Sequence, residues 1–556
     1  MPMNHIQKAA RRLAAASLLA LVATACDDVL VAENLGSPDV DRVFATPSAV
    51  EQTLGTGYQA CHNAVVKTAA ILPALLSVSL ESYSGLNNFD LGVRAAIPRN
   101  PIANYTGAPS TFGDFSALSR AGRLAANAVN ALDKLIAEDI ATPNDGVLGS
   151  KQRDLRARAF GFFVIGCNQG WLAMVYDSAG RVVPGMPSDS VPPLSSAKDV
   201  MDAALAMFDS AIVIASLPDA AGFSTEASWL GGTVTSRDNF LRLVRSWRAR
   251  FRAGVARTPT ERIAVDWDKV IADAEAGITT DHTVSTGGST GWNIGFTGSL
   301  MYQDGRGWSQ ITLMYHGMAD ASGRYVTWLN QPLNERIPFL VETPDKRWPA
   351  GDTRDAQVAN SANPANLNSL PFILASKDDE TGAPWGNSFY QSQRTRYIRL
   401  NNDQGPFPEI VKAEIDLLAA EGYIRKGDFV KAAAKIDLTR STRAGLPKLA
   451  GVLLNGTDPV PGSASCVPRI PVPLTGGSYT TACGTMFEAM KYEKRMETGY
   501  TSYGRWWFDS RGWGDLVENS PLEYPTPYEE LNARQKPTYS LGGGLGSSAA
   551  KGTYGF

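Results

Sequence analysis

The sequence predicts a mainly α-helical protein whose helical hairpins pack against an irregular, loop-rich lobe. Two observations carry this prediction. Apolar side chains recur at helical spacing through much of residues 47–276 and again from residue 409. Between these regions, residues 277–408 contain five tryptophans but no regular period. With 556 residues, the chain is long enough for several helical layers around a large core.

The first residues have the pattern of a bacterial lipoprotein signal. A basic start precedes a short run of alanine and leucine, and small residues then lead to Cys26. Small side chains are needed there because the cleft of a signal peptidase is narrow. The apolar run is too short to span a bilayer as a permanent helix. We expect a signal peptide at 1–25, a lipid on Cys26 and a leader at 26–46; an ordinary signal peptide, with Cys26 incidental, is the alternative.

Helical spacing of apolar residues defines the region 47–276. In one example, Val200, Leu205, Phe208 and Ile212 lie on one side of a predicted helix. A loop rich in asparagine and aromatic residues, 83–113, interrupts the series. The predicted helices are 49–58, 60–80, 116–137, 152–176, 197–215, 239–255 and 267–276.

Residues 277–408 differ from the rest in composition. Glycine, proline and asparagine break the segment, which is too long to be an ordinary structureless loop. Disordered segments are poor in aromatic residues, so the tryptophans argue against disorder. We predict an ordered lobe of loops, short helices and a hairpin.

The final region, 409–556, begins with the clearest hairpin signal. Val411, Ile415 and Leu418 recur at helical spacing, residues 426–428 form a turn, and small residues then recur on the following helix. Small residues allow two helices to approach closely, so the segment predicts a tetratricopeptide-like hairpin. Residues 244–267 and 203–217 look like weaker copies. Several such hairpins should stack, because one cannot bury its own apolar face.

Charged and aromatic residues alternate near the end of the chain. The charged positions are Glu493, Arg495, Glu497, Arg505, Asp509 and Arg511. They could form a catalytic carboxylate cluster, but each acid has an arginine nearby, and paired forks of this kind are structural. We therefore predict ion pairs that hold helix ends against the core, with Trp506, Trp507 and Trp513 inside it.

Four cysteines follow Cys26. Cys466 and Cys483 bracket a loop rich in proline and glycine, so they are the predicted disulfide in an exported chain. Cys167 lies in an apolar helical run, which suggests a buried thiol. No two cysteines have the CxxC spacing of a metal site, and we predict none.

Composition and missing motifs exclude several classes of function. The net charge is −3 and no basic run occurs, which argues against a nucleic-acid partner. His-Glu-x-x-His and the phosphate-binding loop are absent, and no cofactor is indicated. The sequence does not exclude a glycosidase, because its two catalytic carboxylates must be close in space but need no fixed spacing in sequence.

A sugar ligand is compatible with the middle lobe. Aromatic rings cover the apolar face of a sugar, and amide, acidic and guanidinium groups bind its hydroxyls. The alternative is that these aromatic residues are the core of the lobe. Peptides would use similar residues. The candidate contacts are Asn87, Asn88, Phe89, Trp292, Tyr302, Trp308, Trp328 and Trp385.

Three blocks in this order resemble the SusD/RagB family of outer-membrane nutrient-binding lipoproteins. They are the start at Cys26, the helix pair from Glu414 to the Arg443-Ala444-Gly445-Leu446 turn, and the block from Tyr492 to Gly514. The last block departs from the family pattern at Thr498, where leucine is usual, and carries one extra residue between Arg505 and Asp509.

The resemblance implies the mainly α, SusD-like fold predicted above and a partner. The partner is a TonB-dependent outer-membrane channel over which the lipoprotein acts as a lid. The predicted function is non-catalytic binding of an oligomeric nutrient, a glycan or a peptide, by a lipid-anchored protein on the outer face of the outer membrane. The alternatives are an extracytoplasmic glycan hydrolase and an envelope scaffold that binds another protein.

Overall fold

The computed structural model describes residues 43–66, 71–86, 90–105, 112–139, 145–292, 310–363, 372–374, 383–501 and 504–556. The chain divides into two units, 1–46 and 47–556, and the helices between Pro47 and Ala533 all belong to the second. The predicted signal peptide and Cys26 lie outside the described residues. Within them, no helix combines the length and the apolar character that a membrane crossing requires.

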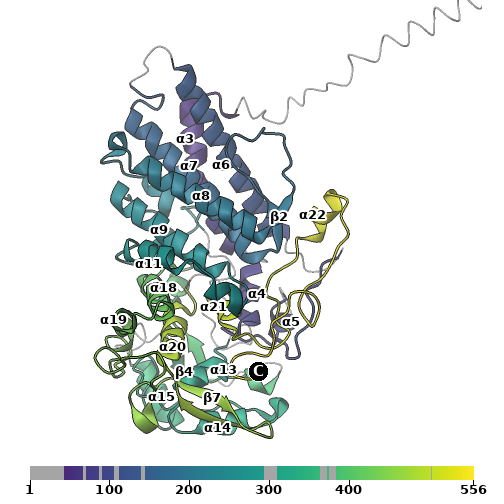
Figure 1. Cartoon of the computed structure of the whole chain (residues 1–556), viewed down its shortest axis with the longest axis vertical. Helices are drawn as coiled ribbons and strands as arrows, with labels where there is room; N and C mark the ends of the chain where they lie inside the picture. Colours follow the sequence, from purple (N-terminus) through teal and green to yellow (C-terminus); the bar gives the residue numbers. More distant parts are fainter. Residues whose placement is uncertain are drawn as a thin grey trace, which may run out of the picture. The chain divides into compact units, whose positions relative to one another are not determined.

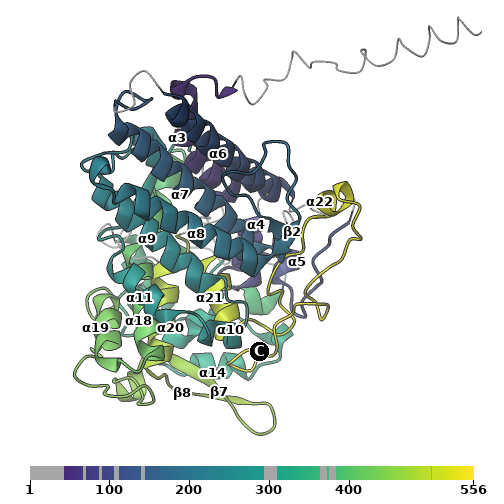
Figure 2. The ribbon, with the colours of Figure 1, turned by 45° about the horizontal axis from the view of Figure 1, so that its top comes forward.

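Four long helices lie side by side in the N-terminal half (Figures 1 and 2). α7 packs between α6 and α8, and α3 packs against both α6 and α7. α9 packs against α8, and α11 packs against α9. These helices are α3 (Pro47–Val66), α6 (Phe112–Glu138), α7 (Lys151–Val175), α8 (Ala197–Ala215), α9 (Arg237–Gly254) and α11 (Trp267–Glu275).

The predicted helices from residue 116 to 276 agree with the structure to within a few residues. The prediction of separate helices at 49–58 and 60–80 was wrong, because α3 runs without a break through residue 66. Tyr58, Cys61 and His62 all face the interior, so packing favours a continuous helix there. α4 (Ile71–Val78) is a second helix, and residues 67–70 are not described.

Glycines on α7 allow its neighbours to approach closely. A Cβ atom added to Gly170 would lie 2.1 Å from a ring carbon of Phe251 on α9. A Cβ atom on Gly161 would lie 2.5 Å from a methyl carbon of Val129 on α6. These separations are far below van der Waals contact, so both helix contacts require glycine.

An antiparallel strand pair separates α11 from the C-terminal hairpin. β3 (His282–Thr286) pairs with β6 (Gly405–Ile410), with Val284 opposite Phe407. The helix expected from residue 409 therefore starts only at Lys412, because strand pairing with β3 takes residues 405–410.

The predicted helical hairpin is present as α18 (Lys412–Arg425) and α19 (Phe429–Arg440). Asp428 ends the turn and caps α19 by accepting the N–H of Lys431 at 3.2 Å. α18 packs on α11, so α9, α11, α18 and α19 form a stack (Figure 1). The segment 203–217, in contrast, is α8 and its end rather than a hairpin.

The middle region is as irregular as its sequence predicts. Its described part holds short helices, 3₁₀ turns and one hairpin of its own, in which β4 pairs with β5 in antiparallel fashion. These elements are α13 (Leu313–His316), α14 (Arg324–Leu329), α15 (Arg354–Ala362), β4 (Phe372–Leu374), β5 (Tyr390–Ser392) and α17 (Arg396–Leu400).

Short elements complete the unit. β1 pairs with β2 and β7 with β8, and α20 packs on α18 and α19. They are α5 (Leu91–Ala95), β1 (Ser178–Gly180), β2 (Leu194–Ser196), α10 (Pro259–Ile263), β7 (Arg469–Pro473), β8 (Tyr479–Cys483), α20 (Met486–Thr498), α21 (Arg505–Trp513) and α22 (Tyr528–Ala533).

Five of the six charged residues predicted to pair in the C-terminal block form buried ion pairs, and Arg511 is the exception. Arg347 binds both Glu493 and Glu497 at 2.9 Å. Arg262 of α10 joins Glu421 at 2.6 Å and Asp509 at 3.1 Å. The three tryptophans of the block, Trp506, Trp507 and Trp513, are core residues.

Arg511 is satisfied differently from the other arginines of the block. Its Nη2 donates to the carbonyl oxygens of Met174 and Gly254, at 2.8 and 2.9 Å. A single guanidinium thus joins the ends of α7 and α9 to α21.

The cysteines of the described chain occupy two kinds of position. Cys466 and Cys483 form a disulfide that closes the β7–β8 hairpin. Cys61 and Cys167 are buried free thiols.

Candidate ligand-binding site

The aromatic and amide residues predicted to bind ligand fall into two groups. Asn87, Asn88, Phe89, Tyr302 and Trp308 lie outside the described residues. Trp292, Trp328 and Trp385 are described, and their exposed fractions are only 2–3%.

The three described tryptophans pack against other aromatic and cationic groups. Trp292 contacts Tyr58, with ring centroids 5.7 Å apart, and Trp385 contacts Tyr83 at 4.9 Å. The guanidinium carbon of Arg336 lies 4.6 Å above the Trp328 ring. The structure thus places these rings in the interior, where the alternative interpretation put them, and they offer no face to solvent in this conformation.

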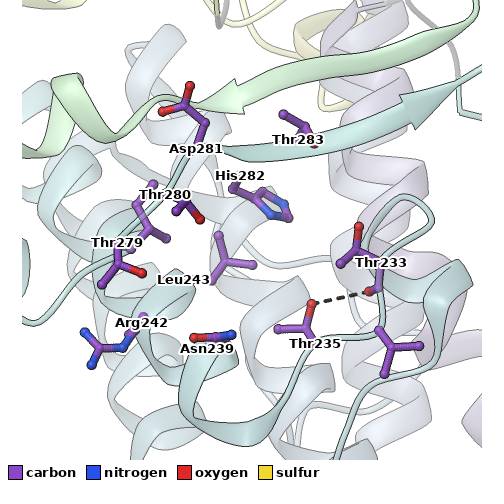
Figure 3. A pocket seen from close by; sticks show the side chains of 12 residues that line it. Thr233, Thr235, Asn239, Arg242, Leu243, Thr279, Thr280, Asp281, His282 and Thr283 are labelled. Carbon is purple, nitrogen blue, oxygen red and sulfur yellow. Dashed lines mark hydrogen bonds between the residues drawn. The ribbon is translucent and has the colours of Figure 1, made fainter.

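A polar pocket with a cavity volume of about 170 Å³ lies between the start of α9 and strand β3 (Figure 3). Three segments line it: the loop after the 3₁₀ turn η3 (Ala227–Leu230), the first turns of α9, and the connection from α11 into β3. The lining residues are Thr233, Val234, Thr235, Asn239, Arg242, Leu243, Ile278, Thr279, Thr280, Asp281, His282 and Thr283.

Local backbone features hold these segments together. The carbonyl oxygen of Gly231 accepts the N–H of Ser285 at 2.6 Å, which fixes the η3 loop against β3. A Cβ atom on Gly231 would lie 2.5 Å from that of Val284, so this contact needs glycine. Ser236 caps α9 by accepting the N–H of Asn239 at 3.4 Å, and this places Asn239 at the pocket.

The pocket has an apolar floor and a polar rim. Leu243 and Ile278 are buried at its base, and Val234 is an exposed lip. The side chains of four threonines and Asn239 have no hydrogen-bond partner among the described residues, so their polar groups are available to a ligand. These threonines are Thr233, Thr279, Thr280 and Thr283.

Two charged residues of opposite sign stand on the rim. Asp281 accepts the backbone N–H of Lys412 through Oδ1 at 2.7 Å, so it also caps the start of α18. Arg242 makes one long hydrogen bond, from Nη1 to the carbonyl oxygen of Gly277 at 3.4 Å. Its other donors have no partner among the described residues, so they could bind a ligand.

His282 lies in the middle of the labelled side chains in Figure 3. Its Nε2 atom is buried and has no hydrogen-bond partner among the described residues. Burial lowers the pKa of His282 to about 4, so the ring is neutral at neutral pH. A buried nitrogen without a partner is uncommon in proteins.

A layer of buried ion pairs lies next to His282. Glu409 accepts a hydrogen bond from His62 Nδ1 at 2.9 Å, and its carbonyl oxygen accepts one from Arg250. Burial opposes the ionisation of Glu409, but the neighbouring His62, His282 and Arg250 hold its pKa below the ordinary value.

The pocket was not predicted from the sequence. Its best signals are the runs Thr233-Val234-Thr235 and Thr279-Thr280-Asp281-His282-Thr283. Tryptophan and tyrosine are the stronger sequence signal for a sugar site, and none from the described residues lines the pocket. The described residues also contain no cluster of three or more histidine, cysteine or acidic side chains placed to bind a metal ion.

Comparisons with known proteins give structural similarity at low sequence identity. No protein-family model matches the chain. No curated protein matches it by sequence. A SusD-like carbohydrate-binding protein from Bacteroides vulgatus has 12% identity and a TM-score of 0.49, with 91% of this chain and 90% of that chain covered.

Two further structures are similar over much of the chain. A SusD/RagB family protein from Bacteroides thetaiotaomicron has 14% identity and a TM-score of 0.47, covering 88% of this chain and 94% of its own. A surface glycan-binding protein from Bacteroides uniformis has 12% identity and a TM-score of 0.42, covering 74% and 83%. The chain is similar to solved SusD/RagB proteins, the family that its sequence motifs also resemble.

Proposed function

We propose that this chain is a nutrient-binding lipoprotein of the SusD/RagB type, which captures a glycan and passes it to a TonB-dependent channel. The observation that carries the binding part is the pocket between α9 and β3. Most of its hydroxyl, amide and guanidinium groups have no hydrogen-bond partner in the part of the chain that the structure describes, and they surround an apolar floor.

This arrangement suits a sugar better than other nutrients. A sugar ring has apolar C–H groups, for which the exposed Val234 provides a surface. Its hydroxyls both donate and accept hydrogen bonds, as do the threonine hydroxyls and the Asn239 side chain. A peptide would use fewer of the threonines, because a peptide backbone presents alternating single donors and acceptors.

The acidic residues favour binding over hydrolysis. A glycosidase of the usual kind needs two carboxyl groups that flank the scissile bond. Among the described residues that line the pocket, Asp281 is the single carboxylate, and one of its oxygens already caps α18. Glu493 and Glu497 are committed to Arg347 in the interior.

The proposals of a lipid anchor and of a channel partner rest on the sequence. The small residues before Cys26 support lipidation, and the ordered motifs of the chain support a channel partner. Triacylation at Cys26 would hold the protein more firmly than a single acyl chain.

Binding and catalysis are tested with the full exported chain. Glycan and peptide arrays are probed first, and any glycan bound is then incubated with the protein and analysed for products. We expect glycan binding with no product. Product formation would instead support a hydrolase, and peptide-only binding would contradict the glycan assignment.

Partner and anchor are tested in cells. Affinity capture from solubilised envelopes should recover a large β-barrel channel, and a Cys26→Ser variant should lose incorporation of labelled fatty acid. Capture of an envelope protein together with blank arrays would support the scaffold alternative. Lipid labelling that persists in Cys26→Ser would exclude that cysteine as the anchor.

A further inference from the structure

We infer that the pocket between α9 and β3 binds a uronic acid residue of a glycan, through an ion pair between the sugar carboxylate and Arg242. This inference rests on the proposed function and deepens it by naming the class of glycan. Three observations carry it. Arg242 has no acidic partner among the described residues, Asp281 lies apart from it, and the groups beside it can bind the hydroxyls of the same sugar.

Arg242 differs from most arginines of its helix. α9 carries six arginines, and four of them form ion pairs with acidic side chains. Arg242 and Arg245 form none with any residue that the structure describes. The two are three positions apart and therefore neighbours on the helix surface, so positive charge is in excess on this part of α9. The paired arginines are Arg237, Arg248, Arg250 and Arg252.

Asp281 does not neutralise Arg242. It alone is acidic among the described residues that line the pocket, and Figure 3 places the two at opposite ends of the labelled side chains. Asp281 accepts the N–H of Lys412 at the first residue of α18, where a negative charge complements the helix dipole. The charge of Asp281 therefore acts at α18, and its second oxygen could accept a sugar hydroxyl.

Arg242 stands beside polar groups that a sugar could use. Asn239 precedes it by three positions on α9, so the two side chains are neighbours. The bond from Arg242 to the carbonyl oxygen of Gly277 brings the guanidinium toward the segment that carries Thr279. A guanidinium binds a carboxylate through two parallel hydrogen bonds, and a uronic acid presents its carboxylate next to ring hydroxyls.

The protein as a whole does not attract anions. Its net charge is −3, so an acidic glycan gains nothing from long-range attraction and depends on local positive charge. A neutral glycan could use the hydroxyl and amide groups of the pocket but not the charge of Arg242. Hydrogen bonds between ionised partners are about twice as strong as those between neutral ones, so an acidic glycan should bind more tightly.

Two substitutions on the rim test the sign of the charge that is recognised. Arg242→Gln removes the positive charge. Asp281→Asn removes the negative charge and keeps an oxygen that can accept the N–H of Lys412. The matched control is Arg120→Gln on α6, an exposed arginine outside the pocket.

The experiment measures oligosaccharide binding to the full exported chain by ligand-observed NMR. The probes are fragments of polygalacturonate, alginate and hyaluronan, each with its methyl ester as the uncharged counterpart. At least one acidic fragment should bind the parent about tenfold more tightly than its methyl ester does, which corresponds to about 1.4 kcal/mol. Arg242→Gln should remove this difference. Asp281→Asn should bind the acidic fragment at least as tightly as the parent, and Arg120→Gln should match the parent.

Three results would overturn the inference. The first is equal binding of acidic fragments and methyl esters to the parent, a comparison that needs no variant to fold. The second is equal binding of the acidic fragment to Arg242→Gln and Arg120→Gln. The third is the opposite sign, in which Arg242→Gln strengthens binding and Asp281→Asn weakens it.

The outcomes also separate this inference from the proposed function. If the parent binds neutral glycans on an array but no acidic fragment, the inference fails and nutrient binding stands. If the parent binds no glycan of either kind, both fail.

Discussion

Arg250 and Glu414 form a two-point ion pair in the interior of the protein. Nε donates to one carboxylate oxygen at 2.8 Å and Nη2 to the other at 2.7 Å. Arg505 of α21 shares the first oxygen at 2.9 Å. Glu414 therefore joins three helices, α9, α18 and α21, through one carboxylate.

Replacing this carboxylate should strongly destabilise the fold. Burial opposes the ionisation of Glu414, but Arg250 and Arg505 lower its pKa to about 2. Glu414→Gln leaves both guanidinium groups without an acid, and we expect a loss of about 3–5 kcal/mol in the free energy of unfolding. Urea unfolding measures it. Exposed Glu335→Gln is the control, and a loss no larger than the control's would contradict this role.

Glu81 should make stability fall as pH rises. It accepts the N–H of Tyr500 at 2.7 Å, and burial raises its pKa from 4.5 to about 8. The folded protein therefore keeps a proton that the unfolded chain releases above pH 4.5. The contribution of Glu81 to the free energy of unfolding is fully present below pH 4.5. It is lost progressively as the pH rises to about 8, by at most about 5 kcal/mol.

Glu81→Gln removes this titration. Its unfolding free energy should exceed that of the parent at about pH 8, and the difference should shrink toward pH 4.5. Urea unfolding at several pH values checks this, with exposed Glu518→Gln as the control. A parent and variant that follow parallel pH curves would show that Glu81 does not titrate as stated.

Gly170→Ala should separate α7 from α9. The added methyl group would lie 2.1 Å from the ring of Phe251, and overpacking of this kind typically costs about 1–3 kcal/mol. Gly113→Ala in α6 is the matched control, since its methyl group would meet nothing within 4 Å. The control should be neutral or slightly stabilising, because alanine favours helix. Equal thermal midpoints for the two variants would argue against the close contact.

The disulfide should stabilise the protein by restricting the unfolded chain. Cys466 and Cys483 are separated by 17 positions, and a loop of this length corresponds to about 3 kcal/mol. The double variant Cys466→Ser, Cys483→Ser should unfold at lower urea concentration. Adding a reductant should bring the parent to the same midpoint and leave the variant unchanged. If neither the reductant nor the double substitution changes the urea midpoint, the disulfide contributes nothing to stability.

Local sequence was sufficient for elements that carry their own signals. α8 has the predicted bounds, because its apolar spacing begins directly after Ser196, which caps the helix. The α18–α19 hairpin likewise carries its turn and its cap. β6 was missed because its strand form depends on pairing with β3, more than a hundred positions away in sequence.

The candidate site was harder to predict for the same reason. Thr280 and Thr260 are both exposed threonines. Only the approach of α9 to β3 places Thr280, and not Thr260, at the pocket. Trp328 and Trp385 suggested ligand contacts by residue type, but burial is a property of the whole fold. Residue chemistry therefore narrowed the class of ligand and could not locate the pocket.

The contacts of Arg511 can form only late in synthesis, because this residue follows Met174 by 337 positions and Gly254 by 257. α7 and α9 leave the ribosome long before the guanidinium that ties Met174 to Gly254 has been synthesised. Nascent chains otherwise tend to fold from the N-terminus. Here the two carbonyl oxygens at the ends of α7 and α9 obtain this donor only once α21 has been made, 257 positions after Gly254.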